Sequence, residues 1–296
     1  MTHIRIYEKI NQCALQALLY EVTVSPKPGL VDRYNSGAHK DMDIFTFMSS
    51  SAALSHYFYD CSVKTINILE NFKDEQLYNH LFITLRKIGL QAENNMYKAT
   101  KGVNTHKGLI FSLGLIAAAA SIVFYKTQDL KISITDVSEE LKKVTKGLCQ
   151  KDFANIDKKE ILSAGEKLYL NDGIKGIRGE AEKGFPSVTD LAYPKLCEYI
   201  QHTSHSFNDI LVNVLLHLMA TTEDTNILSR HDIATLNDVQ KKAKEALELG
   251  GIFTGDGKAY VQHMDRDFIK RNISPGGAAD LLAVTVMFYS LQNNTI

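Results

Sequence analysis

The amino-acid sequence predicts an all-α fold, a single large multi-helix bundle. Apolar residues recur at three- and four-residue steps through most of the chain. Alternating apolar and polar runs bounded by hairpin turns are missing, and KISITDV, beginning at Lys131, is the only candidate strand. Of the five prolines, Pro26, Pro28, Pro186 and Pro275 lie between expected helices, and Pro194 is the exception.

The expected helices follow one another with short breaks. The first carries apolar residues from Ile6 to Leu18 at helical spacing and should end before Pro26. The same spacing recurs in segments 44–59, 76–97, 106–125, 136–148, 159–170, 187–200, 207–221, 236–249, 258–269 and 278–291. No long linker, fixed-period repeat or low-complexity tract separates them, so residues 1–296 are expected to form one domain.

Composition and charge fit an ordinary soluble globular protein. Hydrophobic residues make up 45% of the chain and charged residues 23%, a balance that allows a large buried core. The 33 Lys and Arg residues nearly balance the 34 Asp and Glu residues, so no global field recruits nucleic acid or an anionic membrane. Segment 109–125 is marginal in length for a membrane span and contains Ser112, Gly114 and Ser121, which favours a buried core helix.

Cysteine usage and the N-terminal sequence favour a cytoplasmic protein. The four cysteines are scattered without a CxxC pair, which argues against a disulfide framework and a thiolate zinc site. The N-terminal stretch MTHIRIYEKI has no apolar run before a small-residue cleavage site, so no secretory signal is expected.

The breaks between the expected helices are dense in charged and small polar residues. Five stand out: SPKPGLVDRYNSGAHKDMD, KGVNTHKG, GIKGIRGEAEKGFP, TTEDTNILSRH and NISPGGAADLL. Each one alone also fits ordinary helix caps and turns. Together they predict that the inter-helix junctions converge and form one active-site pocket.

The junction KGVNTHKG directly precedes one of the most apolar segments. Asn104 or Thr105 can cap that helix, which places His106 and Lys107 in its first turn. Cations are unfavourable there, because the helix dipole is positive at its N-terminus, and a bound phosphate would reverse this penalty. The alternative is two solvated side chains.

In the same order along the chain, SPKPGLVDR, GAHKDMD, GVNTHKG, GIRGEAEKGFP, EDTN and SPGGAADLLA resemble the triphosphoribosyl-dephospho-coenzyme A synthases. The resemblance runs from about Glu21 to Phe288 and looks like the stand-alone synthase. It implies that ATP donates its triphosphoribosyl group to the 2′-hydroxyl of 3′-dephospho-coenzyme A and that adenine leaves. The product would be the citrate lyase prosthetic-group precursor, passed to an acyl-carrier-protein prosthetic-group transferase; malonate decarboxylase uses the same precursor.

That reaction needs a held triphosphate, for which a divalent metal with Lys and Arg donors is the general solution. Mg²⁺ is the expected ion, with Asp41 and Asp43 as ligands and with help from Glu223 or Asp224. Asp41 and Asp43 would diverge on a helix, so sharing a metal requires an extended or turn segment. The DMD motif could instead cap the helix that begins near Ile44.

The candidate phosphate clamps come from several junctions, with solvated surface charge as the alternative. They are Lys27, Arg33, Lys107, Arg178 and Arg230. Further substrate-binding candidates are His39, Asn104, Thr105, Asn226, Ser274, Gly276 and Gly277. The two glycines open the last helix, whose N–H groups could meet a second phosphate or the pantetheine diphosphate, or could form a tight packing turn.

Three residues are candidates for the catalytic base: Asp32, Glu180 and, as a rival, His106. The sequence does not rank them. Asp280 is a weaker ligand candidate, and the HMDRD string at 263–267 is interpreted as a solvated helix face. Two rival functions stay open: an all-α, Mg²⁺-dependent hydrolase of an N-glycosidic or phosphate bond, and a helical nucleotide-binding module without chemistry.

Overall fold

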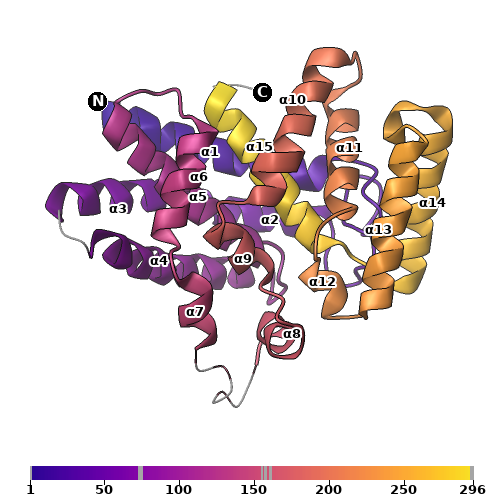
Figure 1. Cartoon of the computed structure of the whole chain (residues 1–296), viewed down its shortest axis with the longest axis horizontal. Coiled ribbons are helices and arrows are strands. Elements are labelled where there is room, and N and C mark those ends of the chain that lie inside the picture. Colours follow the sequence, from indigo (N-terminus) through magenta and orange to yellow (C-terminus); the bar gives the residue numbers. More distant parts are fainter. Residues whose placement is uncertain (1, 73–75, 155, 157–158, 160–161, 294–296) are drawn as a thin grey trace.

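The computed structural model describes residues 2–72, 76–154, 156, 159 and 162–293. Within these ranges the chain is helical and contains no strand, which confirms the all-α prediction (Figure 1). The first helices are α1 (Thr2–Thr23), α2 (Ile44–Ala53), α3 (Tyr57–Asn71), α4 (Leu77–Ala99) and α5 (Lys107–Thr127). They are followed by α6 (Ile134–Val144), α7 (Leu148–Phe153), α8 (Ala164–Asp172) and α9 (Gly176–Glu182).

A short π-helix, Ser187–Ala192, leads directly into α10 (Tyr193–His202). The remaining helices are α11 (Phe207–Met219), α12 (Thr225–Leu228), α13 (Ile233–Glu248), α14 (Gly255–Arg271) and α15 (Gly276–Asn293), with a 3₁₀ turn, Gly251–Phe253, before α14. Figure 1 shows α13 and α14 side by side at one end of the molecule.

The predicted segments appear as helices in the predicted order, but most of α3, nearly all of α7, and α9 and α12 lie outside them. Segment 44–59, predicted as one helix, forms α2 and the first residues of α3, because the chain turns after the C-cap Leu54; α3 then continues beyond the segment to Asn71. KISITDV is not a strand: the Ser133 side chain caps α6 by accepting a hydrogen bond from the Asp136 amide. The predicted helix 159–170 corresponds to α8, which begins after its N-cap Ser163; residues 160–161 lie outside the described residues.

Helix α5 forms the centre of the bundle. It contacts α1, α3, α4, α6 and α15, and its side chains from Leu109 to Phe124 are almost all buried. Within the described ranges it is the one helix long and apolar enough to cross a membrane, but 83% of its apolar window is buried inside the protein. Packing against so many neighbours accounts for its apolar composition, as predicted for a core helix.

One continuous hydrophobic core extends from Ile6 in α1 to Leu291 in α15. A smaller cluster of Cys149, Phe153 and Ile156 packs beside it, with Tyr169 of α8 against its edge. The continuous core is compatible with one domain over residues 1–296, which stays a prediction.

Candidate functional site

A polar cavity of about 190 Å³ lies where four of the five predicted junctions meet. Ten of the predicted site residues line it: Lys27, His39, Asp41, Asn104, Thr105, Lys107, Asn226, Arg230, Ser274 and Gly276. Glu21 and Asp280 add two carboxylates to the same lining. Segments that are far apart in the sequence therefore bring cations and carboxylates together at one place.

A buried ion pair forms one wall of this cavity. The Lys27 ammonium group contacts the carboxylate of Glu21 from the end of α1. Only 1% of Lys27 and 3% of Glu21 is exposed. Because burying either charge alone would be costly, each residue requires the other.

Asp280 faces the cavity from the second turn of α15. A Cβ atom at Gly108 would come within 2.0 Å of Asp280 Oδ2, so glycine is what lets the first turn of α5 approach this carboxyl group. No hydrogen bond or ion pair reaches Asp280 from the residues that the structure describes. Burial, and secondarily the charges of Glu21 and Asp224, raise the pKa of Asp280 well above 3.8.

His39 also lines the cavity, and one nitrogen of its ring is held by a hydrogen bond. Its Nε2 is 2.9 Å from Ser274 Oγ, and its Nδ1 is 3.8 Å from Asp41 Oδ1. Burial, and then the nearby Arg230, lower the pKa of His39, while Asp41 opposes the shift. A neutral His39 is therefore favoured at neutral pH, where it can hydrogen-bond a ligand.

His106 is fully buried and does not line the cavity. Its Nδ1 lies 2.7 Å from Ser50 Oγ, which also accepts a hydrogen bond from the hydroxyl of Thr105 at 2.8 Å. Burial, and then the positive charge of Lys27, lower the pKa of His106 to about 3. The imidazole is thus neutral at physiological pH, and its Nε2 has no hydrogen-bond partner among the described residues.

Asp224 holds two helix ends together behind the cavity. Its Oδ1 accepts from the Asn226 amide at 2.9 Å, and its Oδ2 accepts from the Ala278 amide at 3.0 Å. A Cβ atom at Gly277 would lie only 3.0 Å from this carboxylate, so the glycine permits the close approach. The start of α15, predicted to meet a phosphate, is therefore already bonded to a carboxylate.

The remaining predicted metal ligands do not line the cavity with Asp41. Asp43 is exposed and caps α2, accepting from the Thr46 amide at 2.9 Å, and exposed Glu223 does not line the cavity. Nowhere in the described ranges do three or more His, Cys, Asp or Glu residues form a metal-binding group. Of the four predicted ligands, Asp41 alone lines the cavity.

Asp32 and Arg33 maintain the loop that follows α1. Asp32 is buried, its Oδ1 accepts from the Tyr34 amide at 2.6 Å, and its Oδ2 accepts from the Lys27 amide at 3.0 Å. Arg33 does not line the cavity and donates from Nη2 to Asn208 Oδ1 at 2.8 Å. Asp32 therefore positions Lys27 through its backbone.

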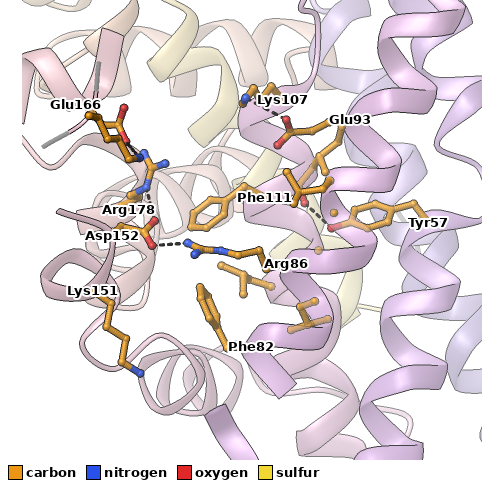
Figure 2. Close-up of a pocket in the computed structure, with 17 residues that line it drawn as sticks. Tyr57, Phe82, Arg86, Glu93, Lys107, Phe111, Lys151, Asp152, Glu166 and Arg178 are labelled. Atoms are coloured by element: carbon orange, nitrogen blue, oxygen red, sulfur yellow. Dashed lines mark hydrogen bonds and ion pairs between the residues drawn. The ribbon is translucent and has the colours of Figure 1, made fainter. Parts of the chain in front are cut away.

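The fifth junction, which forms α9, lies outside the cavity. Glu180 accepts from the hydroxyl of Ser187 at 2.8 Å and from the amide of the same residue at 3.2 Å, and burial raises the pKa of its carboxyl group. Arg178 lines a neighbouring pocket, where its Nε donates to Asp152 Oδ2 at 2.8 Å (Figure 2). Lys107 lines both pockets.

Sequence reasoning missed two residues that shape this site. Glu21 is a lone carboxylate in the apolar end of α1, and its position six residues before Lys27 was the available signal. Asp265 of HMDRD does not lie on a solvated face, because it accepts from the Gly29 amide at 3.0 Å and from the Asn35 side chain at 3.1 Å. It anchors the loop that carries Lys27, and helical periodicity alone gave no signal for this contact.

Comparisons with known proteins point to one family. The family model described as ATP:dephospho-CoA triphosphoribosyl transferase (CitG) matches residues 7–296. The chain is 40% identical over 286 residues to a probable 2-(5″-triphosphoribosyl)-3′-dephosphocoenzyme-A synthase of Lactiplantibacillus plantarum, covering 96% of each chain. It is 37% identical over 278 residues to the synthase of that name from Klebsiella pneumoniae, covering 94% of this chain and 89% of the relative.

The chain is also 39% identical over 287 residues to Protein CitXG of Leuconostoc mesenteroides. That match covers 96% of this chain but 59% of the longer relative. No solved structure matches the chain. The matches confirm the resemblance carried by the junction motifs: this chain belongs to the ATP:dephospho-CoA triphosphoribosyl transferase (CitG) family.

Proposed function

We propose that this chain transfers the triphosphoribosyl group of ATP to the 2′-hydroxyl of 3′-dephospho-coenzyme A and releases adenine. The observation that carries the proposal is the cavity itself, where four motif-bearing junctions of a CitG-family chain meet. The cavity combines cations, which suit a triphosphate, with an unpaired carboxyl group, which suits proton transfer.

The ribose and part of the triphosphate of ATP would occupy the cavity. Arg230 is exposed and forms no ion pair with any residue that the structure describes, so its guanidinium group is available for phosphate oxygens. Lys107 adds a second cation whose ammonium group lies 3.0 Å from Glu93 Oε2. His39 and Asn104 add polar groups to the same lining.

The donors that line the cavity fit Mg²⁺ held jointly by the protein and the triphosphate. Asp41 is the best-placed ligand, because its carboxylate is mostly exposed and lies in the lining beside His39. Mg²⁺ typically takes one or two protein carboxylates together with phosphate oxygens and waters. When bound, it would neutralise part of the charge of the triphosphate.

Asp280 is the proposed proton acceptor. Asp32 and Glu180 already accept hydrogen bonds from backbone and side-chain donors and lie outside the cavity, and His106 is buried behind it. As the acceptor oxygen bonds to the ribose C1′ and the bond from C1′ to adenine breaks, Asp280 would take the hydroxyl proton. Adenine takes up one proton as it leaves. The reaction therefore releases no net proton, because the acceptor hydroxyl loses one.

Adenine release tests the proposed reaction. Incubation with ATP, Mg²⁺ and 3′-dephospho-coenzyme A is expected to release adenine only when the acceptor is present, with one acceptor consumed per adenine. Adenine or phosphate release that does not need the acceptor would favour the hydrolase. No release under any condition, with ATP still bound, would favour the binding module.

The metal assignment gives a separate prediction. Asp41→Ala should raise the Mg²⁺ concentration needed for half-maximal adenine release by about ten-fold or more, since a ligand is lost. Asp43→Ala is the matched control, because Asp43 only caps α2 and its loss should leave the Mg²⁺ requirement unchanged. A wild-type Mg²⁺ titration curve for Asp41→Ala would remove Asp41 from the metal site.

The four cysteines are free thiols, and three of them are buried, which supports the expectation of a reducing, cytoplasmic setting.

The product is proposed to pass to an acyl-carrier-protein prosthetic-group transferase, and citrate lyase is proposed as the enzyme that finally carries the prosthetic group. Adding such a transferase and an acyl carrier protein to the reaction mixture should yield a modified carrier protein.

A further inference from the structure

A second and larger pocket, of about 580 Å³, shares Lys107 at the start of α5 with the polar cavity (Figure 2). Helices α4 and α5 form its floor, and residues of α7, α8 and α9 form the facing wall. Its volume is within the usual range of small-molecule sites. Of the residues that line it, only Lys107 takes part in the steps proposed for ATP.

The floor of the pocket is apolar. It is formed by Phe82, Leu85 and Leu90 of α4 and by Ile110, Phe111 and Leu115 of α5. Leu90 is 56% exposed, although exposed apolar area of this kind costs free energy in water. A ligand with a long arm that carries apolar groups would cover this surface.

Two arginines, Arg86 from the floor and Arg178 from the facing wall, meet at one carboxylate of that wall. Arg86 reaches from α4 to Asp152 Oδ1, and Arg178 of α9 donates to Asp152 Oδ2 at 2.8 Å (Figure 2). The two guanidinium groups also lie over the rings of Phe82 and Phe153, at 5.2 Å and 5.7 Å from the centroids. Asp152 thus fixes both arginines while neutralising only one positive charge.

The charge of the whole pocket favours an anion. Its cationic residues are Arg86, Lys107, Lys151, Lys159 and Arg178, and its carboxylates are Glu93, Asp152 and Glu166. Guanidinium groups present several N–H donors in one plane, so a pair of them suits the oxygens of a diphosphate. The pocket therefore combines an apolar floor with a pair of guanidinium groups suited to bind a diphosphate.

Lys107 connects this pocket to the polar cavity. Its side chain lines both, whereas Gly108 faces only the polar cavity and Phe111 only the larger pocket. A molecule bound over the floor and the arginines could therefore extend past Lys107 toward the ribose of ATP.

We propose that the larger pocket binds the acceptor, 3′-dephospho-coenzyme A. The pantetheine arm lies over the floor of α4 and α5, the diphosphate binds Arg86 and Arg178, and the ribose with its 2′-hydroxyl lies beside Lys107. This assignment rests on the proposed function, because it takes the acceptor from that reaction.

Two variants test the pocket, with binding measured by calorimetry and with KM for each substrate measured from adenine release. Arg178→Gln is expected to raise the Kd and KM for 3′-dephospho-coenzyme A about ten-fold or more, because charge-assisted hydrogen bonds are lost. Leu90→Glu should do the same by placing a negative charge on the exposed floor, where folding is little affected. KM for ATP should stay within about two-fold of wild type.

Matched controls separate this effect from general damage. Ile83→Glu places the same charge on α4 at a residue that is 58% exposed and outside the pocket, and Lys241→Gln removes an exposed cation on α13. Both should retain wild-type constants for both substrates. Arg230→Gln, in the polar cavity, should instead raise KM for ATP.

The outcomes distinguish the two proposals. A wild-type chain that binds 3′-dephospho-coenzyme A but releases no adenine would overturn the proposed reaction. The Kd values of the Arg178→Gln and Leu90→Glu variants would then decide whether the acceptor binds in this pocket. An active wild-type chain whose Arg178→Gln and Leu90→Glu variants bind the acceptor normally would overturn the pocket assignment. Weaker binding of ATP, rather than of the acceptor, in these two variants would overturn it as well.

Discussion

Asp280→Asn is expected to lower kcat for adenine release by roughly 100- to 10,000-fold, the range typical of a lost general base. The same change should make the fold more stable at neutral pH. The Asp280 carboxyl group has no partner among the described residues and lies near Glu21 and Asp224, which disfavours its ionised form. Asparagine keeps the shape without the charge.

The pH dependence of the stability gain follows from the raised pKa. The unfolded chain loses this proton near pH 3.8, whereas the folded chain retains it to much higher pH. Wild-type stability therefore falls as pH rises above about 4 and continues to fall until the raised pKa is passed. Melting temperatures of wild type and Asp280→Asn should nearly coincide at low pH and diverge as pH increases.

Activity should also depend on the ionisation of Asp280, but kcat should rise with pH where the stability of the fold falls. A base must be ionised to accept a proton, so kcat of the wild type should rise with pH through the pKa of Asp280 in the substrate complex. Glu8→Gln removes an exposed carboxylate on α1 and should change neither kcat nor the pH profile. A less stable Asp280→Asn variant with normal pH dependence would instead make Asp280 a structural residue.

Breaking the buried pair of Glu21 and Lys27 should have the largest effect on stability. Lys27→Met or Glu21→Gln alone is expected to lower the free energy of unfolding by about 3–5 kcal/mol, since each leaves an uncompensated charge in a buried site. The double variant should lose much less than the sum of the two single losses. Urea unfolding of all four chains measures the difference.

An exposed pair provides the control for this cycle. Lys241 and Glu245 lie 3.7 Å apart on the surface of α13, and removing either should cost at most about 1 kcal/mol. Additive losses at Glu21 and Lys27 would contradict the assignment of a coupled pair. Single losses as small as those at Lys241 would show that the two charges are solvated.

The helices were predictable because the apolar residues that face the core recur at helical spacing in the sequence. α4 and α11 begin within a residue of their predicted starts, because each carries a full amphipathic or apolar pattern. The break after Leu54 was not predicted, because apolar residues continue at helical spacing through it. Local periodicity records which residues face the core but not where a helix is interrupted.

The candidate site was predictable in part, as a set of junctions. Asp41, Lys107 and Arg230 do meet at one cavity, although nothing in their spacing fixes the direction of the helices between them. Arg178 is in the neighbouring pocket because α9 packs with α7, a tertiary contact without a local signal. Asp224 and Asp280 come from adjacent junctions, and their sequence context does not reveal that Asp224 accepts from backbone amides whereas Asp280 lines the cavity.

A crystal structure with ATP and Mg²⁺, without the acceptor, tests the central claim most directly. We expect the triphosphate beside Arg230, Mg²⁺ in contact with Asp41, and the ribose C1′ near Asp280 at the Lys107 end of the cavity. ATP bound between Arg86 and Arg178, or on a surface away from Asp280, would contradict the account.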